Sequence, residues 1–159
     1  MPSVLFVCTA NQFRSPLAAA CFSKHIEREA LDTKWKVESA GTWTENGMHA
    51  AGIASRVARS LDLGGLESHL TRQVERDLLE QFDLVILMEA GHKEALYSEF
   101  PAARRRLYLL SELVEGIPYD IPDPADPGVD PFDVGREICS LIAKGEKKIL
   151  RLAESLCRD

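Results

Sequence analysis

The chain has 159 residues, of which 45% are apolar and 28% are charged, and its formal net charge is −6. This length accommodates one compact domain, and the apolar fraction excludes a disordered chain, a collagen-like repeat and a coiled coil. The acidic balance disfavours nucleic acid and an anionic membrane surface as partners, so an anionic ligand would need a local site. There is no apolar run of about 18 residues, and no basic segment precedes the apolar start, so we expect a cytoplasmic protein.

Residues 3–8 form an apolar, β-branched run without polar alternation, which is typical of a strand buried on both faces of a parallel sheet. Ser15 and Pro16 predict a helix cap followed by a first-turn proline, and apolar residues at helical spacing extend this helix to about residue 30. Residues 36–39 form a weak second strand, and residues 50–61 present one apolar helical face. Strand, loop and helix therefore alternate along the first part of the chain.

The same alternation continues in the second half. Thr71 can cap a short helix that runs through about residue 82, and residues 83–88 are the clearest buried strand of the chain. Residues 90–98 are expected to be helical. Residues 107–110 form a fourth short apolar run, which we interpret as the last strand.

A loop rich in Pro and Asp covers residues 117–131 and leads into a long last helix. Asp130 and Pro131 are the residue types of an N-cap and a first-turn proline. Four strands alternating with helices predict a single α/β domain over residues 1–159, with three layers and a four-stranded parallel sheet between helices on both faces. Because ligands of such folds bind at the carboxyl ends of the strands, the loop after the first strand is a candidate site.

That loop places Cys8 six residues before Arg14. Unpaired backbone N–H groups and the positive end of a helix dipole converge at such a junction, which makes it a cradle for an anion. We expect the loop to curl around a phosphate with its amides, while Arg14 holds two phosphate oxygens as a bidentate clamp. The predicted phosphate-binding residues of the loop are Thr9, Ala10, Asn11, Gln12, Phe13 and Ser15.

In this loop Cys8 is a candidate nucleophile. The amides, the helix end and Arg14 would stabilise its thiolate, which lies beneath the phosphate for in-line attack and formation of a phosphocysteine that water hydrolyses. The leaving oxygen needs a proton, so a carboxylic acid must reach the loop. We choose Asp123, although Asp126 also precedes a proline and stays open on local grounds, whereas Asp130 is better placed as a helix cap. The alternative is that Cys8 is a buried structural thiol, Arg14 is a surface residue and the Asp-rich segment is a surface loop with no catalytic role.

The remaining cysteines are Cys21, Cys139 and Cys157. They form no C-x-x-C pair and have no His at the spacing of a zinc site, so we expect neither a metal nor a cofactor. Free thiols are the expected state in an intracellular chain of this size. Cys21 is expected to face the core, with an approach to Cys8 left open.

Motifs along nearly the whole chain resemble those of the low molecular weight protein tyrosine phosphatases. They are Val4-Leu5-Phe6-Val7-Cys8 with Asn11 and Arg14-Ser15-Pro16, Glu38-Ser39-Ala40-Gly41-Thr42, Ser68-His69 with Arg72, Asp83-Leu84-Val85-Ile86-Leu87-Met88, and Asp123-Pro124. The resemblance implies a metal-free phosphatase with Cys8 as nucleophile, Arg14 as phosphate clamp and Asp123 as general acid that later activates water. It also implies a supporting hydrogen-bond network of Asn11, Ser15, Ser39 and His69.

The loop departs from the family pattern at two positions. Ala10 replaces the glycine that usually precedes the loop asparagine, and Phe13 replaces a second cysteine found in many relatives. In those relatives the two loop thiols can close into a disulfide that protects the nucleophile. Without that partner, over-oxidation of Cys8 is expected to be easier.

The substrate implied by the resemblance is a tyrosine-phosphorylated protein. Trp43 is a candidate aromatic wall for the phenyl ring, with packing on the surface as the equal alternative. Many relatives carry aromatic residues after the Asp-Pro pair, whereas this chain has Ala125 and Asp126. Two other functions are considered. An arsenate reductase of the same fold needs two further cysteines that relay a disulfide outward, and residues 22–138 contain no cysteine. A phosphoprotein-binding module would not turn over its ligand, and the presence of a candidate general acid, Asp123, argues against it.

Overall fold

A computed structural model describes residues 1–157 and contains a four-stranded parallel sheet with strand order β2-β1-β3-β4. The strands are β1 (Ser3–Cys8), β2 (Lys36–Gly41), β3 (Leu84–Leu87) and β4 (Leu107–Leu109). The α-helices are α1 (Arg14–Arg28), α2 (Gly52–Ser60), α3 (Arg76–Glu80), α4 (Ala90–Glu99), α5 (Leu110–Glu115) and α6 (Pro131–Leu156). Two 3-10 helices, η1 (Asp32–Lys34) and η2 (Pro101–Arg106), complete the secondary structure of the described residues.

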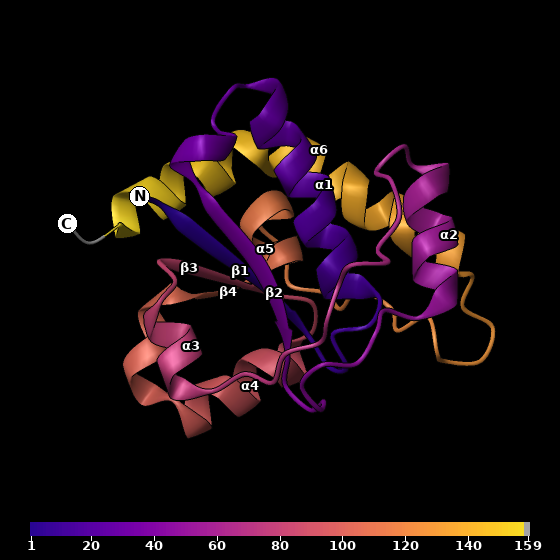
Figure 1. Cartoon of the computed structure of the whole chain (residues 1–159). Helices are drawn as coiled ribbons and strands as arrows, with labels where there is room; N and C mark the ends of the chain where they lie inside the picture. The colour runs from indigo at the N-terminus through magenta and orange to yellow at the C-terminus, as the bar shows by residue number, and fades with distance from the viewer. Residues whose placement is uncertain (158–159) are drawn as a thin grey trace.

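Helices cover both faces of the sheet, which confirms the predicted three-layer α/β fold. Helices α1, α2, α5 and α6 lie on one face, and α3 and α4 lie on the other (Figure 1). The central strand β1 is buried along its whole length. Val4 and Phe6 pack into the core on the α1 side, whereas Leu5 and Val7 pack into the core on the α4 side. Two apolar faces explain why this strand has no polar alternation.

The strand order places a crevice beside the carboxyl end of β1. From β1 the chain crosses through α1 to β2 on one side, and from β3 it crosses through α4 to β4 on the other side. These connections diverge between β1 and β3, and this is the position where open α/β sheets bind their ligands. The loop after β1 therefore lies at the place that the fold makes available for a site.

The predicted cap of α1 is wrong. The helix begins at Arg14 with Phe13 at the N-cap position, and no side chain caps it. Ser15 lies inside the first turn, where its hydroxyl donates to the carbonyl of Ala40 at 3.2 Å. Its side chain therefore contacts the interior of the loop rather than the helix end.

The helix predicted from Thr71 is shorter than expected, because α3 spans only Arg76–Glu80. Thr71 instead connects two loops: its hydroxyl accepts from the amide of Met48 at 2.9 Å and donates to the carbonyl of Glu45 at 2.5 Å. At the other end of the chain the predicted cap of α6 is confirmed, since Asp130 accepts from the amide of Phe132 at 2.9 Å. Among residues 1–157, no helix has the length and apolar character required to cross a bilayer.

Candidate active site

The loop between β1 and α1 is curled and tightly packed. Asn11 adopts a left-handed backbone conformation with φ of 58°, which Asn tolerates better than most residues. The strand β2 passes so close that a Cβ atom on Gly41 would lie 2.5 Å from the carbonyl oxygen of Thr9. The amide of Thr42 donates to the carbonyl of Cys8 at 2.9 Å. Strand β2 thus holds the first residues of the loop from the side.

The amides of this loop are available to a ligand. Within the described part of the chain, no carbonyl accepts a hydrogen bond from the backbone N–H groups of residues 10–15. Two of these residues, Arg14 and Ser15, also form the first turn of α1, whose dipole is positive at this end. A curled run of unpaired amides at a helix N-terminus is the arrangement that binds phosphate oxygens.

Cys8 lies at the floor of the curled loop. It is 2% exposed, and its Sγ atom hydrogen bonds with the hydroxyl of Ser15 at 3.0 Å. The Ser15 hydroxyl and the start of α1 are thus the polar groups next to this sulfur. The sulfur also lines a pocket, which gives a ligand access to it.

The four residues that the family resemblance assigned to a supporting network lie together in the structure. The Asn11 side-chain amide donates to the hydroxyl of Ser15 at 2.8 Å and to that of Ser39 at 2.9 Å. His69 Nε2 donates to the carbonyl of Asn11 at 2.7 Å, and Asn11 Oδ1 accepts from the amide of Arg72 at 2.9 Å. Asn11 is fully buried, so each of these bonds offsets a desolvation cost and fixes the strained loop.

Arg14 connects the loop to the rest of the site. It is 2% exposed, and its guanidinium donates to the carbonyl of Ile121 at 2.8 Å. The same guanidinium lies 3.0 Å from the carboxylate of Glu89 and 3.5 Å from that of Asp123. A buried arginine with partners on two sides is held in one orientation, which is what a bidentate phosphate clamp requires.

A pocket of about 220 Å³ opens above the thiol. Asp123 lines this pocket, whereas Asp126 does not. The backbone turns between the two residues, because Asp123 Oδ1 accepts from the amide of Ala125 at 2.9 Å and the Asp123 carbonyl accepts from the amide of Asp126 at 3.0 Å, and Asp126 is exposed. The lining residues are Cys8, Ala10, Gln12, Phe13, Arg14, Ala51, Ile53, Asp123, Pro124 and Ala125.

Trp43 does not line this pocket, and its side chain is 84% exposed. Its backbone amide donates to the carbonyl of Thr9 at 3.0 Å, so the residue lies next to the loop. The indole ring itself contributes no wall to the pocket. Gln12 and Phe13 are the largest uncharged residues of the loop among those that line the pocket.

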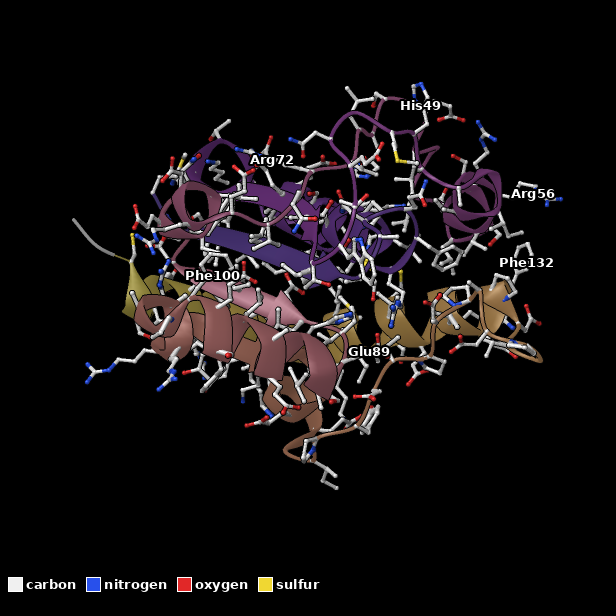
Figure 2. All side chains as sticks on the ribbon, turned by 90° about the horizontal axis from the view of Figure 1, so that it is seen from below. His49, Arg56, Arg72, Glu89, Phe100 and Phe132 are labelled. Atoms are coloured by element: carbon white, nitrogen blue, oxygen red, sulfur yellow. The ribbon has the colours of Figure 1, made fainter. Side chains whose placement is uncertain are left out.

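Sequence reasoning missed two residues of the site, Glu89 and His92. Glu89 lies where α4 begins, next to the loop of residues 117–130 (Figure 2). His92 Nε2 is 2.7 Å from the hydroxyl of Thr9 and 3.1 Å from the carboxylate of Glu89. Both residues follow β3, the strand next to β1, so their position at the carboxyl end of a neighbouring strand was a usable signal.

His92 is neutral near pH 7. Burial, followed by the nearby Arg14 guanidinium, lowers its pKa from 6.5 to about 4, against the opposing effects of Asp120 and Asp123. The 3.1 Å contact between His92 and Glu89 is therefore not an ion pair at this pH. Within residues 1–157, the other ring nitrogen, Nδ1, is buried without a hydrogen-bond partner.

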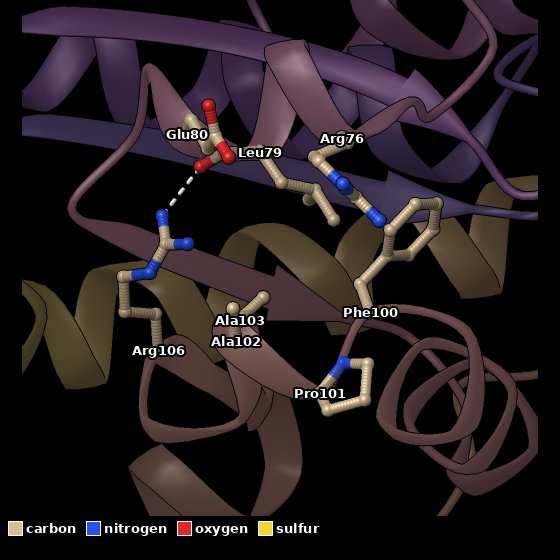
Figure 3. Close-up of a pocket in the computed structure, with 8 residues that line it drawn as sticks. All are labelled: Arg76, Leu79, Glu80, Phe100, Pro101, Ala102, Ala103 and Arg106. Carbon is tan, nitrogen blue, oxygen red and sulfur yellow. Dashed lines mark hydrogen bonds between the residues drawn. The ribbon is translucent and has the colours of Figure 1, made fainter.

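A larger pocket, of about 360 Å³, lies away from this loop, between α3 and η2 (Figure 3). Arg106 donates to the backbone carbonyl of Leu79 at its edge. None of the eight residues that line it has a thiol or hydroxyl group, and none of the predicted site residues is among them.

Among the described residues, no group of three or more His, Cys, Asp or Glu side chains is placed to hold a metal ion. The candidate site is therefore the pocket above Cys8.

Fold and pocket together define the class of protein: a phosphatase that works through a cysteine thiol. The model of the low molecular weight phosphotyrosine protein phosphatase family matches residues 3–159, and the chain belongs to this family.

Relatives within the family carry two different names. The chain is 32% identical over 160 residues to a protein-arginine-phosphatase of Bacillus subtilis (strain 168), covering 98% of this chain and 97% of that protein. It is 34% identical over 149 residues to a low molecular weight protein-tyrosine-phosphatase of Streptomyces coelicolor, covering 89% of each. A solved structure of a YwlE arginine phosphatase mutant with a phosphorylated active-site serine matches with a TM-score of 0.84 at 29% identity, covering 94% of this chain and 99% of that one.

Proposed function

We propose that this phosphatase hydrolyses phosphotyrosine in proteins through a phosphocysteine intermediate on Cys8. The observation that supports this most strongly is the convergence of three groups on one pocket. The Cys8 sulfur lies at its floor among unpaired amides, and Arg14 and Asp123 line the same space and contact each other at 3.5 Å. Each group supplies one requirement of phosphoryl transfer: a nucleophile, a clamp for the equatorial oxygens and a proton donor.

In the first half-reaction the Cys8 thiolate attacks phosphorus. The S–P bond forms, the bond from phosphorus to the phenolic oxygen breaks, and the Asp123 carboxyl protonates the leaving oxygen. The amides of residues 10–15 and Arg14 bind the three equatorial oxygens as their charge develops. Tyrosine then leaves the pocket, while the phosphoryl group stays on sulfur.

In the second half-reaction a water molecule takes the place of the leaving group. The Asp123 carboxylate accepts a proton from this water as its oxygen attacks phosphorus. The S–P bond breaks, the thiolate of Cys8 is restored, and inorganic phosphate departs. The hydroxyl of Ser15, 3.0 Å from the sulfur, turns its proton from the carbonyl of Ala40 to the thiolate as it leaves. The phosphorylated active-site serine in the related arginine phosphatase structure supports a covalent intermediate at this position.

The walls of the pocket support an aromatic substrate. Beyond the charged groups, its lining is mainly apolar, and Phe13, Ile53 and Pro124 are the largest apolar residues in it. A phenyl ring buries apolar surface against such walls and leaves only its phosphate to be bound by polar groups. The pocket has no carboxylate other than that of Asp123, so it offers few acceptors for the several N–H groups of a guanidine.

Phosphoarginine is the second candidate substrate. It is favoured by the arginine phosphatase of Bacillus subtilis, which matches along almost the whole chain, and by the lack of an aromatic wall from Trp43. The amide of Gln12 lines the pocket and is a polar group that a guanidine could use. Family membership favours either phosphatase activity over an arsenate reductase or a non-catalytic binding module.

The test uses two peptides that differ only in carrying phosphotyrosine or phosphoarginine. We expect phosphate release from the phosphotyrosine peptide with a kcat/KM at least about tenfold higher, and no turnover by Cys8→Ser. A reversed ratio would reject phosphotyrosine as the substrate and keep the cysteine mechanism. Equal turnover by wild type and Cys8→Ser would reject the mechanism itself.

A further inference from the structure

Two cysteines outside the active site lie against each other. Cys21 is on α1 and Cys139 is on α6, two helices that pack side by side on the same face of the sheet (Figure 1). The sulfur of Cys21 is 3.9 Å from the backbone carbonyl of Cys139, and both residues line the same surface pocket. Two cysteines this close on neighbouring helices are candidates for a disulfide, because the bond requires their backbones to lie near each other.

The pair is accessible from solvent. Both residues line a surface pocket of about 230 Å³, together with Lys24 and Arg28. Cys21 is 5% exposed, whereas Cys139 is partly exposed. A small neutral oxidant such as hydrogen peroxide therefore has a path to Cys139, beside the Lys24 ammonium, which favours a thiolate there. Reactive thiols in proteins occupy partly exposed, electropositive places of this kind.

The two thiols are not equivalent. The neighbouring Cys21 thiol lowers the pKa of Cys139 and Lys24 lowers it as well, against the effect of burial. For Cys21, the neighbouring Cys139 thiol and burial both raise the pKa. Cys139 is also the more exposed of the two, so it is the sulfur that meets the oxidant first, and Cys21 is the thiol that reacts in a second step.

We propose that Cys21 and Cys139 form an oxidisable dithiol, a modification site for hydrogen peroxide that is separate from the catalytic thiol. First the Cys139 sulfur attacks one peroxide oxygen: an S–O bond forms, the O–O bond breaks, and hydroxide leaves and is protonated to water. The sulfur is oxidised to sulfenic acid and the peroxide is reduced. The Cys21 sulfur then attacks the Cys139 sulfur, so that an S–S bond forms and the S–O bond breaks. The hydroxyl group leaves as water with the Cys21 proton.

The position of the pair gives this modification a structural consequence. Helix α1 begins in the phosphate loop and carries Cys21 on its core side, whereas α6 follows the loop that carries Asp123. A disulfide between them joins two helices that are far apart in sequence, which restricts the unfolded chain and stabilises the folded one. Because Cys8 is not part of the bond, a chain carrying the disulfide keeps its catalytic thiol.

The experiment treats the full-length protein with a small excess of hydrogen peroxide, blocks remaining thiols with iodoacetamide and maps the proteolytic peptides by mass spectrometry. We expect a peptide cross-linked through Cys21 and Cys139 that has lost two hydrogens and is cleaved by dithiothreitol. Cys139→Ser should lose this peptide completely. Cys157→Ser, the matched control, and Cys8→Ser should both retain it.

Two further readouts do not depend on a stable Cys139 variant. In Cys21→Ser, dimedone should label Cys139, because its sulfenic acid then has no resolving thiol. The oxidised wild-type chain should unfold at a higher urea concentration than the reduced chain, and dithiothreitol should reverse this shift. Full alkylation of both Cys21 and Cys139 after peroxide treatment that has already oxidised Cys8 would overturn the proposal.

Discussion

The guanidinium of Arg14 lies 3.0 Å from the carboxylate of Glu89, at the junction of β3 and α4. Arg14 starts α1, so this ion pair connects the two helices that follow neighbouring strands on opposite faces of the sheet. Asp123 approaches the same guanidinium from the loop on the other side at 3.5 Å. The phosphate clamp is therefore oriented by carboxylates that come from two distant parts of the chain.

Replacing Glu89 by glutamine should therefore weaken both stability and catalysis. The substitution keeps the shape but removes the charge that pairs with a buried arginine, which we expect to cost about 2 kcal/mol of unfolding free energy. A less oriented Arg14 should lower kcat/KM by roughly tenfold or more. Urea titration and kinetics with an aryl phosphate measure the two effects. Glu94→Gln, an exposed position on the same helix, is the control and should leave both values unchanged.

The two aspartates of the Pro-rich loop should differ sharply in kinetics. Asp123→Asn removes the proton donor, and we expect kcat for a phosphotyrosine peptide to fall by about 10²–10⁴-fold. Asp126→Asn is the matched control, since Asp126 is exposed and does not line the pocket. Should Asp126→Asn be the more damaging change, Asp123 is not the general acid.

Gly41 provides a test of the loop geometry without touching a reactive group. A methyl group at this position would come within 2.5 Å of the Thr9 carbonyl and 3.1 Å of the Asn11 amide nitrogen, so the phosphate loop must shift in Gly41→Ala. A displacement of this order lowers kcat/KM by roughly 10²-fold. Gly52→Ala at the start of α2 meets no atom within 4 Å and should retain full activity. Unimpaired kinetics of Gly41→Ala would show that the loop does not need this close packing.

His92 should make the stability of the protein depend on pH in the acid range. Its pKa falls from 6.5 to about 4 on folding, so between these values the unfolded chain binds a proton that the native chain does not. Stability is therefore complete above pH 6.5 and declines as the pH is lowered, by about 2 kcal/mol at pH 5.

The check compares unfolding free energies at pH 7 and pH 5 in wild type and His92→Gln. From pH 7 to pH 5 the unfolding free energy of the variant should fall less than that of the wild type, and the difference should equal the contribution of His92. His49→Gln, which changes an exposed histidine, should follow the wild type (Figure 2). An identical pH dependence in His92→Gln and wild type would contradict the proposed burial of a neutral imidazole.

The parts of the site that could be predicted from sequence were those encoded locally. A doubly buried strand, a loop and a helix start are contiguous, so the spacing of Cys8 and Arg14 already placed both residues around one anion cradle. Glu89 and His92 were missed because their role depends on which strand neighbours β1. The sheet order places β3 there, and only this adjacency brings the residues after it to Arg14 and Thr9.

The roles of two other residues could not be predicted from the sequence for a similar reason, because they depend on hydrogen bonds between distant segments. Thr71 is a good helix cap by type, but its hydroxyl is used by residues 45 and 48 of another loop. Trp43 could not be oriented from its position after β2. The Gln73 side chain bonds both the amide of Thr44 and the carbonyl of Thr42 at 2.8 Å, and this fixes the backbone so that the indole is exposed.

The covalent role of Cys8 is tested most directly by quenching the reaction with acid during the first turnover of a phosphotyrosine peptide. Mass spectrometry should find one phosphoryl group on the peptide that contains Cys8, present while substrate lasts and gone after it is consumed, and none in Cys8→Ala. Steady release of inorganic phosphate by the wild type with no phosphoryl group on Cys8 at any time would contradict a phosphocysteine mechanism.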